Sequence, residues 1–259
     1  MRIARARIGN EEHFGHVTGS EKGLLFHVLN GDPLHAGLSI ARTGQELPLE
    51  NVQLLAPVAG PTKIVGFGKN FTGAPKVTSW REGSPVTFLK PPSAVIGPGE
   101  TILLPSGARE VELEAELAVV IGTRTHRIQH SDALDHAFGY TVVNDVTAKD
   151  YMTDGHWTRP KGYDTFCPVG PWIETELDPR DVMVQGAVDG VIVQRGSTAD
   201  MVLDVAGLIA YAADIFTLEP GDLILTGSPP GRTTLVAGQK VTVSVDGIGE
   251  LINPVELAR

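Results

Sequence analysis

One stretch constrains the fold of this chain more than any other, the segment REVELEAELAVVIG at residues 109–122. Glutamate occupies positions 110, 112, 114 and 116, and an apolar residue occupies each position between them. A spacing of two is the period of a β-strand, so the four carboxylates are predicted to point to one face. The segment then continues as LAVVIG, an apolar run typical of a strand buried on both faces. Carboxylates at the mouth of a buried strand are costly unless a cation compensates them.

Composition limits the class of protein. The chain has 259 residues, of which 42% are hydrophobic and 20% charged, which predicts one large globular domain or a large domain plus a small one. A net charge of −10 without a basic run argues against binding nucleic acid or an anionic membrane. The most apolar long window, residues 201–216, is too short to span a bilayer, and the start lacks a signal-peptide pattern. Cys167 is the single cysteine, so we expect neither disulfides nor a cysteine metal site, and a cytoplasmic location.

The order of motifs predicts two units. Residues 1–58 have the alternation of short strands and are predicted to form a small N-terminal β domain, with 59–63 as a linker and 59–259 as the larger domain. Further strands are predicted at 63–68, 85–91, 111–122, 137–146, 182–193 and 239–255, with hairpin turns at Asp189-Gly190 and Asp246-Gly247. One helix is predicted between Val205 and Phe216. Because strands dominate, we expect a strand-rich α+β fold, a mixed β-roll or barrel.

A second acid follows an apolar strand, because the motif GYTVVNDV places Asp145 directly after a run that ends in Val143 and Asn144. Carboxylates at the ends of buried strands can converge. Two glutamates at i and i+2 plus this aspartate would offer the oxygen ligands that Mg²⁺, Mn²⁺ or Ca²⁺ prefers. The competing hypothesis is a zinc site built on His126, His130 and His136. Their spacing indicates a loop, so we favour a hard cation on the carboxylates over zinc on these histidines.

Longer motifs of the chain carry a resemblance to a known family. They are FLKPPSAVIGPGETILLP at 88–105, EAELAVVIG at 114–122, GYTVVNDVTAKDYM at 139–152, WTRPKGYDTFCPVGPWI at 157–173 and PGDLILTGSPPG at 220–231. In this order and spacing they resemble the fumarylacetoacetate hydrolase family, especially its small bacterial members, from roughly residue 60 onward. The small N-terminal unit resembles the short leading domain of that family.

The resemblance implies the site residues. The metal ligands of the family map onto Glu114, Glu116 and Asp145, and the metal is Mg²⁺ or Mn²⁺, with Ca²⁺ as an alternative. By that register Glu110 and Glu112 are not ligands, and we interpret them as a solvated strand start or as acids beside the ligands.

Three further positions follow from the same motifs. Lys161 matches the lysine that faces the metal-bound substrate, where an ammonium can stabilise an enolate. Thr226, with the neighbouring N–H of Gly227, matches the turn that receives a substrate carboxylate. Lys149 stands where the family usually has arginine, so it keeps the charge of a substrate-binding group but loses the planar fork. The resemblance also implies a small anionic oxo acid as substrate and a homodimer.

The segment KNFTGAPKVTSW at 69–80 departs from the family pattern, which has a tyrosine followed by a His-x-x-Glu pair on a lid helix. Phe71 replaces the tyrosine, Ala74 stands where the histidine is expected, and Pro75 breaks the expected helix. No histidine occurs between His35 and His126, so no register restores the pair. The usual base that activates water is therefore missing.

This departure shapes the predicted activity. We expect a divalent-metal-dependent enzyme of oxo-acid or aromatic-compound catabolism that acts on small 2-oxo or 2-hydroxy-dienoic dicarboxylic acids. Its reaction would be C–C cleavage, with decarboxylation ahead of hydrolysis, or isomerisation. His156 is a candidate replacement base, although a loop histidine without a catalytic role is the favoured interpretation. The alternatives are a relative that binds metal and an oxo acid without turnover, and carboxylates that hold no metal.

Overall fold

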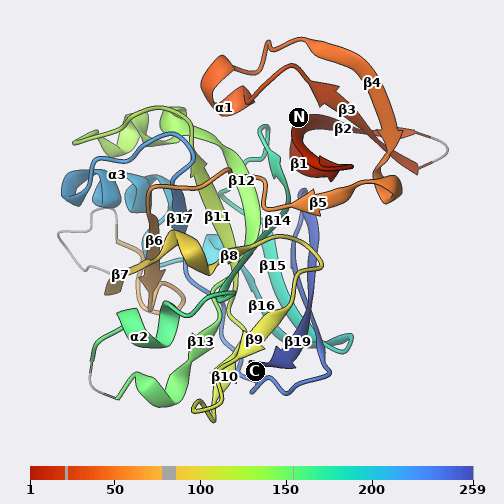
Figure 1. Cartoon of the computed structure of the whole chain (residues 1–259). Helices are drawn as coiled ribbons and strands as arrows, with labels where there is room; N and C mark the ends of the chain where they lie inside the picture. The colour runs from red at the N-terminus through yellow and green to blue at the C-terminus, as the bar shows by residue number, and fades with distance from the viewer. Residues whose placement is uncertain (21–22, 78–85, 154, 259) are drawn as a thin grey trace.

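A computed structural model describes residues 1–20, 23–77, 86–153 and 155–258 of the chain. The last three residues of the segment 69–80, and the first of the strand predicted at 85–91, lie outside the described residues. Two β-sheets, packed face to face, make up most of the molecule, and the N-terminal strands extend one of them to the upper right in Figure 1.

The larger sheet combines N-terminal strands with strands of the rest of the chain. Its N-terminal strands are β1 (Arg2–Ile8), β2 (Glu11–Ser20), β3 (Gly23–Leu29), β4 (Arg42–Pro48) and β5 (Gln53–Leu55). Its other strands are β6 (Ile64–Gly68), β7 (Val86–Lys90), β8 (Val95–Ile96), β11 (Ala115–Ile121), β12 (Ala137–Asn144), β14 (Cys167–Glu174) and β17 (Leu223–Leu225). In the described part of the chain the order is β4-β3-β2-β1-β14-β12-β11-β17-β6-β7, with β5 beside β1 and β8 beside β14.

The second sheet has the order β16-β15-β18-β19-β9 among the described residues. Its strands are β16 (Val191–Ser197), β15 (Met183–Val188), β18 (Lys240–Val245), β19 (Gly249–Leu257) and β9 (Ile102–Leu104). A short ribbon pairs β10 (Val111–Glu112) with β13 (Thr147–Ala148). Contacts of β15, β18 and β19 with β11, β12 and β14 close the two sheets around the main hydrophobic core. Parallel pairs, such as β6 with β17, occur beside antiparallel ones, so the fold is the strand-rich, mixed α+β arrangement that was predicted.

The helices are short and peripheral. They are α1 (Pro33–Ala36), α2 (Thr158–Lys161) and α3 (Val205–Ile215), with 3₁₀ turns η1 (Leu49–Asn51), η2 (Pro92–Ala94), η3 (His130–His136), η4 (Lys149–Tyr151) and η5 (Thr198–Asp200). The side chain of Asp204 accepts a hydrogen bond from Gly207 N at 2.8 Å and so caps α3 at its N-terminus. The helix predicted between Val205 and Phe216 is thereby confirmed to within one residue. Among the described residues, none of these helices has both the length and the apolar character needed to cross a membrane.

Both predicted hairpins form. Asp189 and Gly190 have φ angles of 49° and 81°, as a two-residue turn of type I′ requires, and they join β15 to β16. The turn at Asp246-Gly247 joins β18 to β19, but the register pairs Val245 with Gly249, so this loop has one residue more than predicted.

The sequence prediction was wrong in its treatment of residues 111–122 as one strand. The structure ends β10 at Glu112 and begins β11 at Ala115. Between them, Glu114 N donates to the side-chain Oδ1 of Asn144 at 3.0 Å rather than to a strand carbonyl. This side-chain bond lets the backbone change direction where the acids lie.

In the described part of the chain, the N-terminal strands belong to the larger sheet through one strand pair. β1 pairs with β14 through Arg2 opposite Glu174 and Ile3 opposite Ile173. The boundary between residues 58 and 59 stays a prediction.

Candidate metal centre

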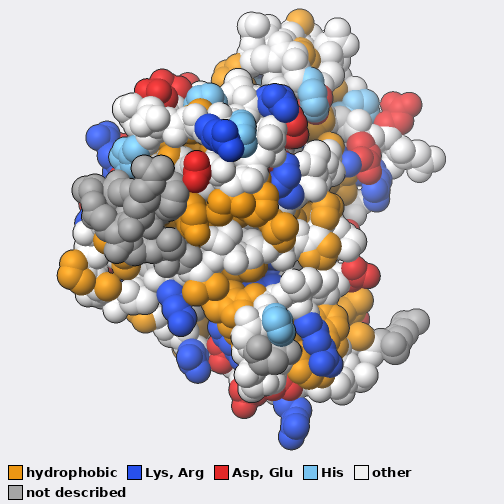
Figure 2. Space-filling model, turned by 90° about the vertical axis from the view of Figure 1, so that its left-hand side faces the viewer, with side chains coloured by type: hydrophobic (Ala, Val, Ile, Leu, Met, Phe, Trp, Pro, Cys, Tyr) orange, Lys and Arg blue, Asp and Glu red, His pale blue; other side chains and the backbone are white. Residues whose placement is uncertain are grey.

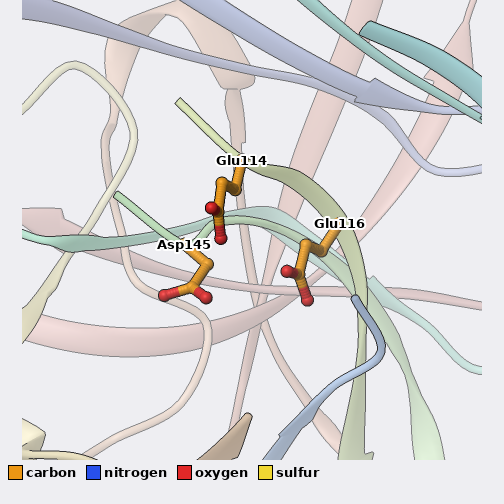
Figure 3. Close-up of side chains that lie close together, drawn as sticks. All are labelled: Glu114, Glu116 and Asp145. Carbon is orange, nitrogen blue, oxygen red and sulfur yellow. The ribbon is translucent and has the colours of Figure 1, made fainter. Parts of the chain in front are cut away.

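Three acids converge where β11 begins and β12 ends. These strands are antiparallel and pair Ala115 with Asn144, which places Glu114 and Glu116 on either side of that pair and Asp145 just beyond it. Asp145 N donates to the carbonyl of Glu114 at 2.9 Å and ties the two strand ends together. One carboxylate oxygen from each acid lies within 4.8 Å of the others. Figure 3 shows the three side chains pointing toward a common space.

Glu116 has the least compensated charge of the three. Its side chain is 2% exposed, and burial raises its pKa well above 4.5, with the charges of Asp145 and Glu114 acting in the same direction. Its Oε2 accepts a hydrogen bond from Gly227 N at 2.7 Å. Among the described residues it makes no salt bridge. The Glu116 side chain is therefore either protonated, or ionised with its negative charge compensated by a bound cation.

Lys161 lies between the other two acids. Its Nζ donates to Glu114 Oε2 at 2.6 Å and makes a short contact with Asp145 Oδ2. It also lies 4.6 Å from the centre of the Phe88 ring and 5.7 Å from that of Trp157. Burial alone would lower the pKa of Lys161, but the surrounding carboxylates outweigh it and raise the pKa. Lys161 therefore keeps its proton.

A second buried ammonium, that of Lys90 at the end of β7, was missed by the sequence analysis. Lys90 Nζ donates to Asp145 Oδ1 at 2.7 Å and to the carbonyl of Val146 at 3.2 Å. Burial would raise the pKa of Asp145, but Lys161 and Lys90 together lower it. The available signal was a lysine that ends a short β-rich strand directly before two prolines, in FLKPP.

Lys149 and Glu112 form the rim. Lys149 Nζ contacts Glu114 Oε1 and lies 4.0 Å from Glu112 Oε2. Burial raises the pKa of Glu112, and the charges of Lys149 and Arg232 offset part of this. Glu112 is only 8% exposed, so its interpretation as a solvated acid was wrong and the alternative, an acid beside the ligands, describes it. Glu110 is exposed, as expected.

The turn after β17 closes the site. The hydroxyl of Thr226 donates to the carbonyl of Leu117 at 2.9 Å, while Gly227 N holds Glu116 as described above. Both donors thus fasten the turn to β11. Their role in receiving a substrate carboxylate stays a prediction.

The competing histidines do not converge. His130 Nε2 pairs with Asp204 at 2.9 Å, and His136 Nδ1 lies 2.8 Å from Thr125 Oγ1. His126 is exposed. Within the described ranges, the three acids are the one group of three or more His, Cys, Asp or Glu residues close enough to share an ion.

Residues 69–77 form no helix, and the ring of Phe71 in this segment lies near the site. A Cβ built on Gly227 would lie 3.7 Å from Phe71, which places this ring beside the turn that holds Glu116. A Cβ built on Gly68 would lie 2.3 Å from the ring of Trp157, so only glycine permits this close packing. In the described part of the segment where the family's lid helix was expected, the structure has a non-helical chain with Phe71 beside the turn.

His156 lies in an exposed position immediately before Trp157.

Figure 2 shows the left-hand face of Figure 1, where α3 and α2 lie. Hydrophobic side chains gather across the middle of this face, and basic and acidic side chains are mixed around them. One sign of charge does not dominate it.

Comparison with known proteins decides the family. A family model described as fumarylacetoacetate (FAA) hydrolase C-terminal matches residues 63–256. The chain belongs to the fumarylacetoacetate hydrolase family. A second model, described as Rv2993c-like N-terminal, matches residues 1–57.

Two relatives and two solved structures illustrate the range of this family. Protein Rv2993c of Mycobacterium tuberculosis is 44% identical over 218 residues, covering 82% of each chain. The mitochondrial oxaloacetate tautomerase fahd2 of Xenopus laevis is 39% identical over 225 residues, covering 81% of this chain and 70% of the relative. The 5-carboxymethyl-2-hydroxymuconate delta-isomerase of Mycobacterium smegmatis superposes over 100% of both chains with a TM-score of 0.92 and 38% identity. The maleylpyruvate hydrolase of Sphingobium sp. SYK-6, solved with manganese(II) and pyruvate, does so with a TM-score of 0.81 and 32% identity.

Proposed function

We propose that this protein is a divalent-metal-dependent enzyme that interconverts keto and enol forms, or shifts double bonds, in small 2-oxo dicarboxylic acids. The observation that carries the proposal is the convergence of three buried carboxylates, two of which accept hydrogen bonds from the buried Lys161. Membership of a family that contains an isomerase and an oxaloacetate tautomerase supports it.

The ligand set suits a hard cation. Ligand oxygens around one Mg²⁺, Mn²⁺ or Ca²⁺ lie at most about 4 to 5 Å apart, and the oxygens of Glu114, Glu116 and Asp145 lie within 4.8 Å of one another. Asn144 Nδ2, beside them, is buried without a protein partner among the described residues and can donate to an added oxygen ligand. We therefore assign Mg²⁺ or Mn²⁺ to these acids, with Ca²⁺ as an alternative. When bound, the ion would polarise the 2-oxo group of the substrate.

Lys161 supplies the second half of the chemistry. Its ammonium donates to Glu114 and Asp145 in the structure, so we assign it the role of a hydrogen-bond donor and a positive charge beside the substrate oxygens. Such a group would stabilise an enolate oxygen, whose charge develops as the neighbouring carbon loses CO₂, or loses a proton to a water molecule in the site. Lys149 at the rim would hold the remote carboxylate. Thr226 and Gly227 would contribute to this only by releasing Leu117 and Glu116, to which they donate in the structure.

The surroundings favour enolate chemistry over hydrolysis. Hydrolysis needs a base to activate water, and no histidine occurs between His35 and His126. Phe71 lies beside the turn that holds Glu116, and Trp157 lies 5.7 Å from Lys161 Nζ, so aromatic rings border the site. Decarboxylation of a 2-oxo dicarboxylate passes through the same kind of enolate and is the second candidate.

A direct test uses oxaloacetate with Mg²⁺ or Mn²⁺. Tautomerisation is followed by the ultraviolet absorbance of the enol, decarboxylation by pyruvate formation, and hydrolysis by cleavage of an acylpyruvate. We expect tautomerisation that EDTA abolishes and that Glu116→Ala lowers by about 100-fold or more. The matched control is Glu110→Ala, an exposed acid of the same segment, which should leave the rate unchanged.

Other outcomes identify the alternatives. Acylpyruvate cleavage without tautomerisation would refute the proposal in favour of hydrolysis. Tight metal-dependent binding of oxalate with no turnover would assign the chain as a non-catalytic binder. Absence of any thermal shift with Mg²⁺ or Mn²⁺ would show that the acids hold no metal.

A further inference from the structure

A glutamine of the second sheet reaches into the candidate site. Gln194 belongs to β16, and its residue is 3% exposed, whereas its neighbours Val193 and Arg195 are more open to solvent. Its side-chain amide makes hydrogen bonds to two backbone segments that lie 79 and 35 or more positions away in sequence. A buried amide with both ends satisfied fixes the groups it joins.

The oxygen end holds the segment that carries two of the acids. Gln194 Oε1 accepts a hydrogen bond from Ala115 N at 2.8 Å. Ala115 lies between Glu114 and Glu116, at the point where the strand is interrupted. The two adjacent N–H groups of this interruption are therefore both held by side-chain amides, one by Asn144 and the other by Gln194.

The nitrogen end holds the loop that closes over Glu116. Gln194 Nε2 donates to the carbonyls of Pro229 and Gly231, each at 3.2 Å. This loop begins at Gly227, whose N–H is bonded to Glu116. One side chain thus connects the backbone of the acids with the turn expected to receive the substrate.

The second sheet leaves room for this connection. Gly186 of β15 pairs with Gln194, and the register shifts directly after it. A Cβ built on Gly186 would lie 2.5 Å from Leu113 Cδ1 and 3.3 Å from Gln194 Oε1. A glycine at this position therefore allows the amide to pass over β15 toward Ala115.

We propose that Gln194 is a positioning residue that sets how the segment carrying the metal-binding acids lies relative to the 229–231 part of the loop that follows Gly227. The inference rests on the proposed function, because it assigns a role within the same site. A purely structural role, in which Gln194 only forms hydrogen bonds with buried polar groups, predicts a different result. Loss of Gln194 would then lower the stability of the protein without changing the geometry of the bound ion. Removing the amide would release Ala115 N and the carbonyls of Pro229 and Gly231, while Thr226 and Gly227 would still fasten the start of the loop to β11. The 229–231 part of the loop could then shift relative to the ligand oxygens.

The test compares Gln194→Met with Gln185→Met. Gln185 is a partly buried glutamine of the neighbouring strand β15, so the control makes the same chemical change in the same sheet. The Mn²⁺ dissociation constant is measured by calorimetry, the geometry of bound Mn²⁺ by electron paramagnetic resonance, and kcat and KM with enolic oxaloacetate. Melting temperatures of both variants report any general loss of stability.

We expect Gln194→Met to weaken Mn²⁺ binding by about tenfold, to change the resonance spectrum and to raise KM. Gln185→Met should match the wild type in all three. An Mn²⁺ affinity within twofold of wild type and an unchanged spectrum in Gln194→Met would overturn the inference. If Gln194→Met does not fold, Gln194→Asn decides by the same criteria, because its amide is one methylene too short to reach both segments.

Failure of the proposed function has a different signature. A wild-type protein that binds no Mn²⁺, or a Glu116→Ala variant that binds it as tightly as wild type, would refute the metal site and this inference with it. Normal metal binding and turnover in the wild type, unchanged in Gln194→Met, would refute the inference alone.

Discussion

Replacing Lys161 by methionine should produce a protein that binds metal more tightly than the wild type yet turns over poorly. Lys161 is 1% exposed and donates to Glu114 Oε2 at 2.6 Å, as well as to Asp145. An ion that takes these oxygens as ligands must displace the ammonium. Methionine keeps the unbranched apolar stem and removes only the competing charge.

The size of the effect follows from that contact. Two unit charges at 2.6 Å in an effective dielectric constant of about 20 attract with about 6 kcal/mol. Desolvation of the buried ammonium offsets much of this attraction. We take a quarter to a half of this attraction as the free energy lost when the ion displaces the ammonium of Lys161. Removing the ammonium would then favour Mn²⁺ binding by about 1.5 to 3 kcal/mol, which corresponds to an affinity about 10- to 150-fold higher. Loss of the enolate donor should lower kcat by about 100-fold.

Calorimetric titration of metal-free protein with Mn²⁺ measures the affinity. Lys149→Met is the control, because this ammonium also contacts Glu114 but its side chain is 23% exposed. Water screens its charge, so we expect a gain of about threefold or less. An unchanged or weaker Mn²⁺ affinity in Lys161→Met would show that the ammonium does not compete with the ion.

Three further predictions concern charge in the core. Because burial raises the folded-state pKa of Glu116 above 4.5, the stability that this protonated group contributes to the metal-free protein is lost as pH rises from 4.5 through the folded-state pKa, whereas the Mn²⁺ affinity rises over the same range. An Mn²⁺ affinity that does not change with pH above 4.5 would contradict this. Lys90→Met leaves Asp145 with one cation fewer, and should cost about 3 kcal/mol and lower the melting temperature by about 10 °C. Asp222→Asn replaces a fully buried carboxylate that accepts hydrogen bonds from several groups. Chemical denaturation should show a free energy of unfolding about 3 kcal/mol lower, whereas Asp214→Asn, a change at an exposed aspartate, should leave it unchanged.

Sequence reasoning located the acids because their pattern is local. An i, i+2 pair on an apolar strand and an aspartate at the end of another strand could be recognised without knowing how the chain folds. The motifs then selected Glu114 and Glu116 from four similar glutamates. The strand-rich fold and the helix capped by Asp204 depended on equally local signals.

The features that were missed depend on partners far away in the chain. Lys90 acts on Asp145, 55 positions later, and nothing in FLKPP indicates that partner. The interruption of the strand at Glu114 depends on side-chain amides from two other strands. The burial of Glu112 likewise follows from packing of β10 against β13 rather than from its own neighbours in sequence.

The carboxylates of Glu114, Glu116 and Asp145 and the ammonium groups of Lys90, Lys149 and Lys161 have formal charges that cancel when all are ionised, and at the rim the charge of Arg232 offsets that of Glu112. A divalent ion alone would leave two uncompensated positive charges in a place shielded from water, and a dicarboxylate alone would leave two negative ones. Together they restore neutrality. Ion and dianionic substrate should therefore each raise the affinity for the other by the same factor, with a coupling of about 1–3 kcal/mol. The site would thus discriminate against monocarboxylic acids by charge balance as well as by shape.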